Sequence, residues 1–204
     1  MRIRFRKEGD LRLISHRDLA RLCERLFRRA GLRLAMSEGF HPKAKLSFPS
    51  ALGLGIAGLD EVLEVELLDE LAAEEVVRRL TEQAPPGFAI IKLAPVPEGT
   101  RKAQVQQASY EIAIPPEREG PLRAAIAALL AEKSHWHTRP DRKTPVDIRG
   151  SLEELELRDG RLCMTLRHYQ EGSVRPRDVL VVLDLSDLEA EGFYLTRTKV
   201  FLAS

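Results

Sequence analysis

The sequence predicts an α+β protein made of two tandem ferredoxin-like halves, the second of them irregular. Apolar residues recur with period two in some segments and with helical period in others along the 204 residues. In the first half these segments follow the order strand, helix, strand, strand, helix, strand, which is the split βαβ pattern of a ferredoxin-like domain. A proline-bearing and then polar segment, 95–107, follows. We therefore expect an N-terminal domain over 1–97 and a C-terminal domain over 108–204.

The first predicted strand covers 2–7. Basic residues alternate there with Ile3 and Phe5, so these two side chains should face the core. After a turn at 8–10, the residues 11–14 continue the extended stretch.

A strongly basic helix should follow this strand. Ser15 has the features of an N-cap residue with Asp18 three positions later, and Gly31 those of a C′ terminator. Apolar residues at helical spacing predict a buried stripe: Leu19, Leu22, Cys23, Leu26, Phe27 and Ala30. The remaining positions present arginines to solvent: Arg17, Arg21, Arg25 and Arg28. Glu24 lies among them and could neutralise one.

The most informative stretch is the loop over 37–48, which joins the basic helix to the next strand. Gly39 suits a backbone with positive φ, and Pro42 restricts the residue before it to extended conformations. The loop therefore presents a set of side chains in a restricted backbone: Phe40, His41, Lys43 and Lys45. Such a cationic loop is typical of a site for an anionic partner.

The rest of the chain continues the pattern. In the first half, 61–67 and 88–93 are predicted strands on either side of a helix over 71–83. In the second half we expect strands at 109–114, 152–157, 162–168 and 193–201, helices at 120–131 and 176–183, and a short extended piece at 135–138. Asp159 and Gly160 predict a hairpin turn, and Ser173 a helix cap.

Charge is distributed unevenly along the chain although its formal net charge is only +1. Residues 1–50 contain 13 Lys and Arg against 5 Asp and Glu, whereas 51–100 contain 3 against 10. Paired strands should cancel part of this opposition, and the remainder should leave a basic face. The sequence has neither an apolar run of transmembrane length nor a signal-peptide core, so we expect a cytoplasmic protein without membrane contact.

Metal chemistry is not expected. The two cysteines, Cys23 and Cys163, lie far apart in apolar patterns, which favours reduced, buried thiols over a disulfide or metal pair. His135 and His137 lack a ligand spacing typical of zinc sites. Trp136 and Tyr169 could stack on bases, although burial is the commoner fate of aromatic side chains.

Several motifs, taken together, resemble the radical-SAM-linked protein family, a domain of unknown function found fused to, or encoded beside, radical-SAM proteins. These motifs cover most of the chain: Ser15-His16-Arg17-Asp18, Arg28-Arg29-Ala30-Gly31-Leu32, Ser37-Glu38-Gly39-Phe40-His41-Pro42, Lys45-Leu46-Ser47-Phe48, Asp147-Ile148-Arg149, Gly172-Ser173-Val174-Arg175-Pro176 and Thr196-Arg197-Thr198. The chain departs from the family pattern at Gly150-Ser151, where a proline and an aromatic residue are expected. This departure weakens any transfer of a role to Asp147 and Arg149.

The resemblance implies a radical-SAM protein as partner. No three-cysteine cluster motif precedes the domain, so this chain resembles the stand-alone form. An iron–sulfur cluster and S-adenosylmethionine would then belong to the partner, and this chain would hold no cofactor.

Combining the resemblance with the basic segment, we expect a non-catalytic module that binds RNA or presents a tRNA- or rRNA-like substrate for modification. The expected nucleic-acid contacts come from the basic helix, the loop and one arginine of the second half: Arg17, Arg21, Arg25, Arg28, Gly39, Phe40, His41, Lys43, Lys45 and Arg175.

Two alternatives remain open. A metal-independent endoribonuclease would use His41 or His16 as general base and Lys45 to stabilise developing charge. A protein-only adaptor would instead use the basic helix to dock an acidic partner.

Overall fold

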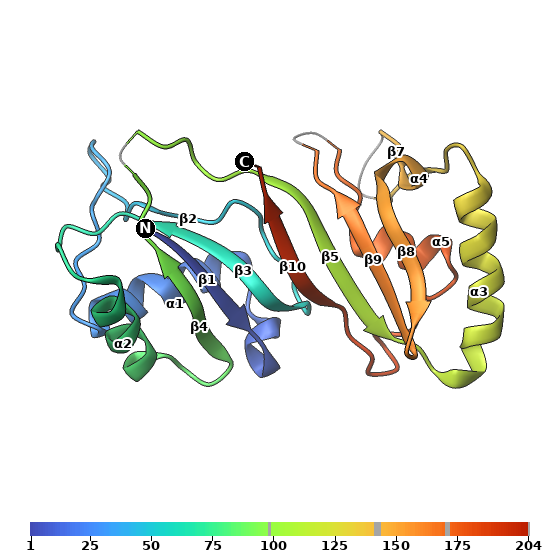
Figure 1. Cartoon of the computed structure of the whole chain (residues 1–204), viewed down its shortest axis with the longest axis horizontal. Helices are drawn as coiled ribbons and strands as arrows, with labels where there is room; N and C mark the ends of the chain where they lie inside the picture. Colours follow the sequence, from blue (N-terminus) through green and yellow to red (C-terminus); the bar gives the residue numbers. More distant parts are fainter. Residues whose placement is uncertain (98, 141–143, 170–171, 204) are drawn as a thin grey trace. The chain divides into compact units, whose positions relative to one another are not determined.

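The computed structural model describes residues 1–97, 99–140, 144–169 and 172–203 (Figure 1). The chain divides into two compact units, Met1–Gln104 and Val105–Ser204. The division falls within the polar segment 95–107. Each unit combines helices with an antiparallel sheet, so the predicted α+β class is confirmed.

The first unit has a sheet in which β1 lies between β4 and β3, and β3 also pairs with β2. All of these pairings are antiparallel. Along the chain the elements are β1 (Arg2–Lys7), the 3-10 helix η1 (Gly9–Leu13), α1 (His16–Arg29), β2 (Leu46–Ser47), β3 (Ala57–Val65), α2 (Ala73–Gln83) and β4 (Phe88–Ala94). Strand β3 begins four residues earlier than predicted, so it includes Gly58.

The core of the first unit lies between its sheet and the helices α1 and α2. The predicted inward positions of β1 are buried, and Phe5 stacks on Phe88 with ring centroids 5.0 Å apart. The predicted stripe of α1 is confirmed, with Leu22 only partly buried at its edge. Side chains from both helices and the sheet make up this core: Ile3, Phe5, Leu19, Cys23, Leu26, Phe27, Val76 and Leu80.

One local prediction in this unit is wrong, because 11–14 does not continue the extended stretch. Gly9 has φ +57°, which turns the chain into η1 directly after β1. The amide of Glu8 donates to the carbonyl of Gly87 (2.8 Å), and the buried Lys7 ammonium donates to the carbonyl of Ile14 (3.1 Å). Hydrophobic periodicity carries no information about such contacts, and Glu8 and Gly87 are far apart in the sequence.

The second unit has a sheet in the order β10-β5-β9-β8, with β6 and β7 forming a separate two-stranded sheet. Strand β5 pairs antiparallel with both β10 and β9, and the pairs β8–β9 and β6–β7 are antiparallel too. Its elements are β5 (Val105–Ala113), α3 (Pro116–Ala131), β6 (Trp136–His137), β7 (Val146–Asp147), α4 (Ile148–Ser151), β8 (Leu152–Arg158), β9 (Arg161–Arg167), α5 (Pro176–Val182) and β10 (Thr196–Leu202).

The local turn chemistry of this unit was predicted in part. Asp159 and Gly160 have φ of 49° and 68° between β8 and β9, as a two-residue hairpin turn with both central residues left-handed requires. The predicted cap at Ser173 is wrong. The Ser173 hydroxyl donates to the carbonyl of Tyr169, and Arg175 occupies the N-cap position, where the Asp178 carboxylate accepts its amide.

The opposite charges of the first hundred residues partly cancel within the first unit. Arg2 pairs with Glu64 (2.8 Å) and Arg4 with Asp60 (2.5 Å) between β1 and β3. Both arginines lie on the face of β1 opposite Ile3 and Phe5. The basic residues of α1 lie outside this set of pairs, so the cancellation expected from the sequence leaves that helix charged.

No helix within the described residues is long and apolar enough to cross a membrane.

Candidate nucleic-acid interface

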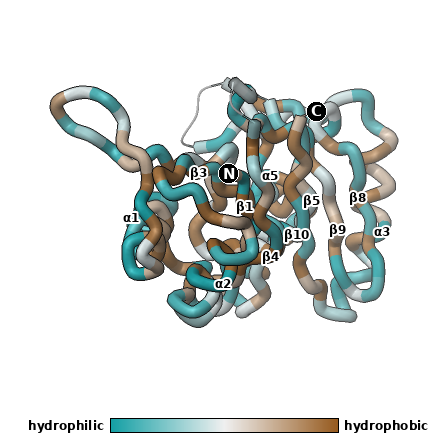
Figure 2. The backbone as a smooth tube through the Cα atoms, turned by 60° about the vertical axis from the view of Figure 1, so that its left-hand side comes forward, coloured by the Kyte–Doolittle hydropathy of each residue, from teal (hydrophilic) through white to brown (hydrophobic). Residues whose placement is uncertain are grey.

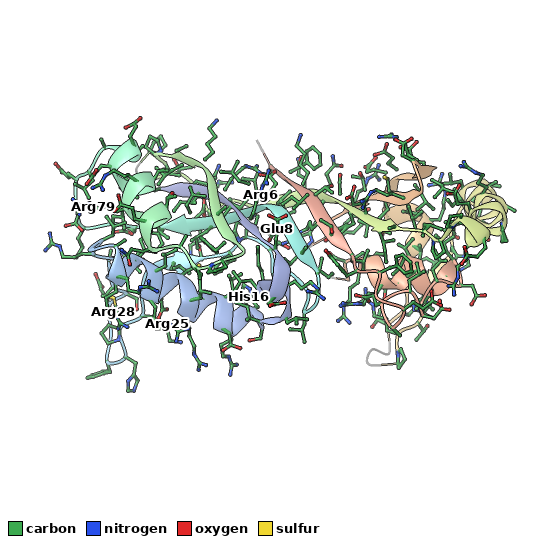
Figure 3. All side chains as sticks on the ribbon, turned by 90° about the horizontal axis from the view of Figure 1, so that it is seen from below. Arg6, Glu8, His16, Arg25, Arg28 and Arg79 are labelled. Carbon is green, nitrogen blue, oxygen red and sulfur yellow. The ribbon has the colours of Figure 1, made fainter. Side chains whose placement is uncertain are left out.

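Helix α1 exposes a row of arginines because its apolar stripe faces the core. Arg17, Arg25 and Arg28 are exposed, and within the described residues no ion pair or hydrogen bond involves their guanidinium groups. Figure 3 shows Arg25 and Arg28 on the side of α1 that points away from the sheet. Guanidinium groups without a carboxylate partner remain available to phosphate oxygens.

Both ends of α1 are fixed by local hydrogen bonds. At its start, the Ser15 hydroxyl oxygen accepts the amide of Asp18 (3.1 Å), which confirms the predicted N-cap. At its end, Gly31 has φ +68°. The amide of Leu32 donates to the carbonyl of Phe27, and the amide of Gly31 donates to the carbonyl of Arg28. This is a Schellman motif, and it redirects the chain at a defined angle.

After α1, two extended segments pair and form an arm that carries the cationic loop. Met36 bridges Ala44, and the amide of Lys45 donates to the carbonyl of Ala35 (2.7 Å). The amide of Ala35 donates to the carbonyl of Glu66, which holds the arm at the end of β3. The connection between α1 and β2 therefore projects as a narrow loop with a fixed base (Figures 1 and 2).

The base of this arm is also held by ion pairs. The Arg33 guanidinium lies 2.7 Å from one carboxylate oxygen of Asp69, and the other oxygen accepts the Arg33 amide. These contacts hold the pKa of the Asp69 carboxyl below its ordinary value, with the backbone hydrogen bond as the largest cause. The arm is therefore anchored at neutral pH.

The tip of the loop exposes an aromatic ring beside positive charge. Gly39 has φ +115°, as predicted, and a Cβ there would meet no atom within 4 Å. Phe40 is 101% exposed, so none of its ring is covered by the protein. His41 and Lys43 are also exposed, and their side chains have no partner within the described residues. An uncovered aromatic ring on a projecting loop offers a face on which a base can stack.

Two predicted cations are already paired. Arg21 lies 3.4 Å from Asp18, so Asp18 and not Glu24 neutralises part of the helix face. The Lys45 ammonium lies 2.9 Å from a carboxylate oxygen of Glu66. The loop therefore offers fewer available charges than its sequence indicates.

The predicted nuclease residues are not joined by any hydrogen bond or ion pair within the described part of the chain. His16 packs edge-on against Phe48, with ring centroids 5.1 Å apart, and Phe48 in turn contacts Phe5. Lys45 is engaged by Glu66. This arrangement gives His16 a packing role at the start of α1.

Arg175 belongs to the second unit and is exposed at the N-cap of α5. Next to it, a buried pair joins Arg139 to Asp178, with relative exposures of 5% and 7% and nitrogen–oxygen distances of 2.8 and 2.5 Å. Asp178 thus fixes both Arg139 and the backbone of Arg175.

Asp147 and Arg149 have structural contacts in this unit. The Asp147 carboxylate accepts the amide of His135 (2.9 Å), and the Arg149 guanidinium donates to the carbonyl of Leu130 (3.2 Å). A Cβ on Gly150 would lie 2.5 Å from an Asp147 oxygen, which accounts for glycine there. The motif fastens the end of α3 to the β6–β7 sheet.

Other side chains differ from the sequence expectation in exposure. Trp136 is 65% and Tyr169 43% exposed, so the buried reading is wrong for both. Cys23 is buried, whereas Cys163 is half-buried, and both are free thiols. Burial raises the pKa of Cys23 to about 12. Among the described residues, no group of three or more His, Cys, Asp or Glu could hold a metal ion.

Two features were missed by sequence reasoning. Arg29 is exposed at the end of α1 and has no partner within the described residues, so it extends the arginine row. A pocket also opens beside the arm, lined in part by Arg101 and Lys102. The first could have been found from the helix end, whereas the second requires knowledge of where 99–102 lies.

Comparison with known proteins identifies the family. The model of a family described as "uncharacterized protein conserved in bacteria (DUF2344)" matches residues 1–176. The chain belongs to this family. No curated protein matches it.

Proposed function

We propose that this member of the uncharacterized bacterial family is a non-catalytic RNA-binding module that presents a tRNA- or rRNA-like substrate to a radical-SAM enzyme. The observation that carries the RNA part is the combination of unpaired arginines on α1 with the bare ring of Phe40 on the arm that follows. The radical-SAM partner rests on the motif resemblance described above.

The two parts of the interface suit two parts of a nucleic acid. Arginine forks on α1 match phosphate oxygens in geometry and charge, and they bind backbone without regard to sequence. An exposed aromatic ring offers a stacking surface, and unpaired bases of RNA loops are the usual partners of such rings. Phe40 therefore favours RNA with unpaired bases over a regular duplex.

We also infer that both units are ferredoxin-like. Each follows the order strand, helix, strand, strand, helix, strand, once β6, β7 and α4 are treated as an insertion in the second unit. In each, the first strand lies beside the fourth and the third, and the second is at the edge next to the third. This is the arrangement of the split βαβ motif.

Crosslinking in cells tests the RNA part of the proposal. We expect tagged wild-type protein to crosslink RNA, and the site should map to the loop around Phe40. A Phe40→Ala variant should lose most of this crosslink. Absence of crosslinked RNA from the wild-type protein would contradict the proposal.

Purification of partners with and without nuclease tests the rest. A radical-SAM protein should be recovered with the chain. If nuclease treatment leaves recovery of an acidic protein unchanged and no RNA is found, the chain acts as a protein-only adaptor and the RNA proposal fails.

A further inference from the structure

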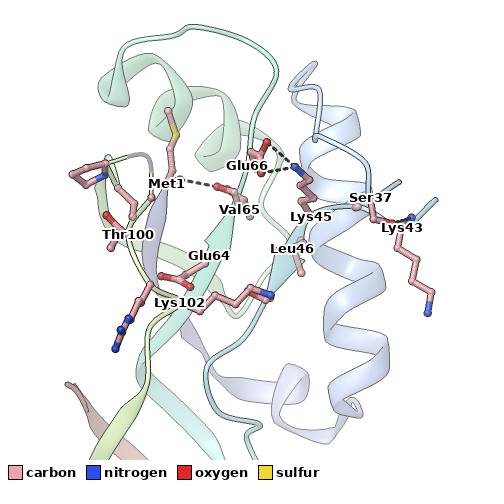
Figure 4. Close-up of a pocket in the computed structure, with 16 residues that line it drawn as sticks. Met1, Ser37, Lys43, Lys45, Leu46, Glu64, Val65, Glu66, Thr100 and Lys102 are labelled. Carbon is pink, nitrogen blue, oxygen red and sulfur yellow. Dashed lines mark hydrogen bonds and ion pairs between the residues drawn. The ribbon is translucent and has the colours of Figure 1, made fainter. Parts of the chain in front are cut away.

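The first unit contains a second feature suited to a ligand, an open pocket of about 940 Å³ beside the base of the arm. Its walls come from the end of β3, from 43–47, and from the residues 96–97 and 99–102 that follow β4 (Figure 4). Ligand pockets for molecules of nucleotide size have volumes of this order. The α1 arginines are not among its lining residues, whereas Lys43 and Lys45 of the loop are, so the pocket shares the base of the arm with the proposed interface.

The acidic groups of this pocket are already engaged. Glu64 accepts hydrogen bonds from Arg2 (2.8 Å) and from the amide of Ala103 (3.1 Å). Glu66 pairs with Lys45 (2.9 Å). These carboxylates thus orient the walls, and each has a cationic partner that offsets its charge.

Three lining cations have no hydrogen-bond or ion-pair partner within the described residues, namely Lys43, Arg101 and Lys102. We assign the ligand contact to Lys102. Its ammonium has no hydrogen-bond or ion-pair partner within the described residues, and its side chain extends across the pocket toward Leu46 (Figure 4). The hydroxyls of Ser47 and Thr100 also line the pocket, and no hydrogen bond among the described residues uses them. An ammonium is suited to a phosphate group, and hydroxyls can donate to phosphate or sugar oxygens.

Part of the remaining wall is apolar. Leu46, Val65 and Val96 line the pocket together with the side chain of Met1. Such walls favour a flat, weakly polar ring over a fully hydrated sugar phosphate or an inorganic ion.

We propose that this pocket binds a nucleoside monophosphate. Lys102 and the hydroxyls contact the phosphate and the sugar, and the apolar walls hold the base. The test of this inference is independent of the proposed RNA interface, because the varied residues, Lys102 and Thr100, lie outside both α1 and the loop.

Titration followed by NMR tests this proposal with AMP, adenosine, ribose 5-phosphate and inorganic phosphate as probes. AMP should bind with a Kd below about 1 mM and perturb the amides of 43–47 and 99–103. Adenosine lacks the phosphate and the other two lack the base, so each should bind at least about tenfold more weakly.

Two variants and one matched control complete the experiment. Lys102→Gln should weaken AMP binding about tenfold or more through loss of a charge-assisted hydrogen bond. Thr100→Trp should fill the pocket and abolish binding, and its exposed position makes a folding defect unexpected. Lys92→Gln removes an exposed lysine of β4 that does not line the pocket, so it should bind AMP as the wild type does.

Three results would overturn the proposal. The first is that AMP at about 10 mM perturbs no amide resonance. The second is that both pocket variants bind AMP as tightly as the wild type. The third is that AMP and inorganic phosphate bind equally tightly. RNA binding is measured separately with α1 variants. A failure of AMP to bind would therefore not contradict the RNA proposal.

Discussion

The ammonium of Lys45 lies 2.9 Å from a carboxylate oxygen of Glu66, across 21 residues of sequence. The pair is exposed, with relative side-chain exposures of 45% and 58%. It decides which cations of the loop are available, because Lys45 has an anionic partner and Lys43 has none within the described residues. The available charge of the loop therefore resides at Lys43.

The Lys45–Glu66 pair should limit the RNA affinity of the loop. Glu66→Gln should release Lys45 and strengthen RNA binding, with the slope of log affinity against log salt becoming steeper by up to about 0.7. Lys43→Gln should make the slope shallower by a similar amount, whereas Lys45→Gln should change it less. Equal effects of Lys43→Gln and Lys45→Gln would show that the pair does not control availability.

Phe40 should affect binding without affecting stability. Because its ring is 101% exposed, Phe40→Ala should leave the denaturation midpoint unchanged. Loss of base stacking should cost about 1–3 kcal/mol in affinity for single-stranded RNA. Phe40→Trp keeps a stacking surface and serves as the control. If Phe40→Ala binds single-stranded RNA as tightly as Phe40→Trp, stacking is not the role of this ring.

His41 separates the RNA-binding module from the nuclease alternative. His41→Ala should retain most of the RNA affinity, and the wild type should leave RNA intact over long incubation without added metal. Cleavage by the wild type that is lost in His41→Ala, with binding retained, would instead support a histidine-dependent nuclease.

The buried pair in the second unit should dominate local stability. Asp178→Ala leaves the Arg139 guanidinium buried without its carboxylate, which should lower the free energy of unfolding by roughly 3–5 kcal/mol. Asp187→Ala removes one of the two acidic partners of Arg118 at an exposed position and should change stability little. Urea denaturation of both variants measures the difference, and similar losses would contradict the assigned role of burial.

Thiol chemistry should distinguish the two cysteines. Burial raises the pKa of Cys23 to about 12 and also raises that of the half-buried Cys163. Since the folded pKa of Cys23 is raised, its protonated form stabilises the fold below the unfolded pKa of about 8.5, and this contribution is lost as pH rises toward 12. At pH 8 a thiol reagent should modify Cys163 first, and Cys163→Ser should leave the native protein almost unreactive. Rapid modification of Cys23 in that variant would contradict its burial.

Local signals allowed much of the fold to be predicted. Ser15 and Gly31 mark the ends of α1 through contacts within a few residues, and the apolar stripe between them gives the buried face. The extended reading of 11–14 failed because the turn at Gly9 packs against the loop at Gly87, far along the chain.

The candidate site was predicted less completely, for the same reason. Exposed arginines follow from helical periodicity, and the special φ of Gly39 follows from its residue type. The pairing of Lys45 with Glu66 and the position of Lys102 over the pocket depend on how distant segments meet. Arg21 is the exception, since its partner Asp18 is three residues away and visible in the sequence.

The central claim is that unpaired arginines on α1 bind RNA phosphates. The most direct test compares the salt dependence of RNA affinity for Arg25→Gln/Arg28→Gln with that of Arg6→Gln/Lys92→Gln. The control pair removes the same charge from exposed positions on the two paired strands β1 and β4, away from α1. We expect the first variant to make the slope shallower by about 1.4 and to weaken binding to all RNA sequences alike, with the control close to the wild type. An unchanged slope in the α1 variant, or an equal change in both, would contradict the account.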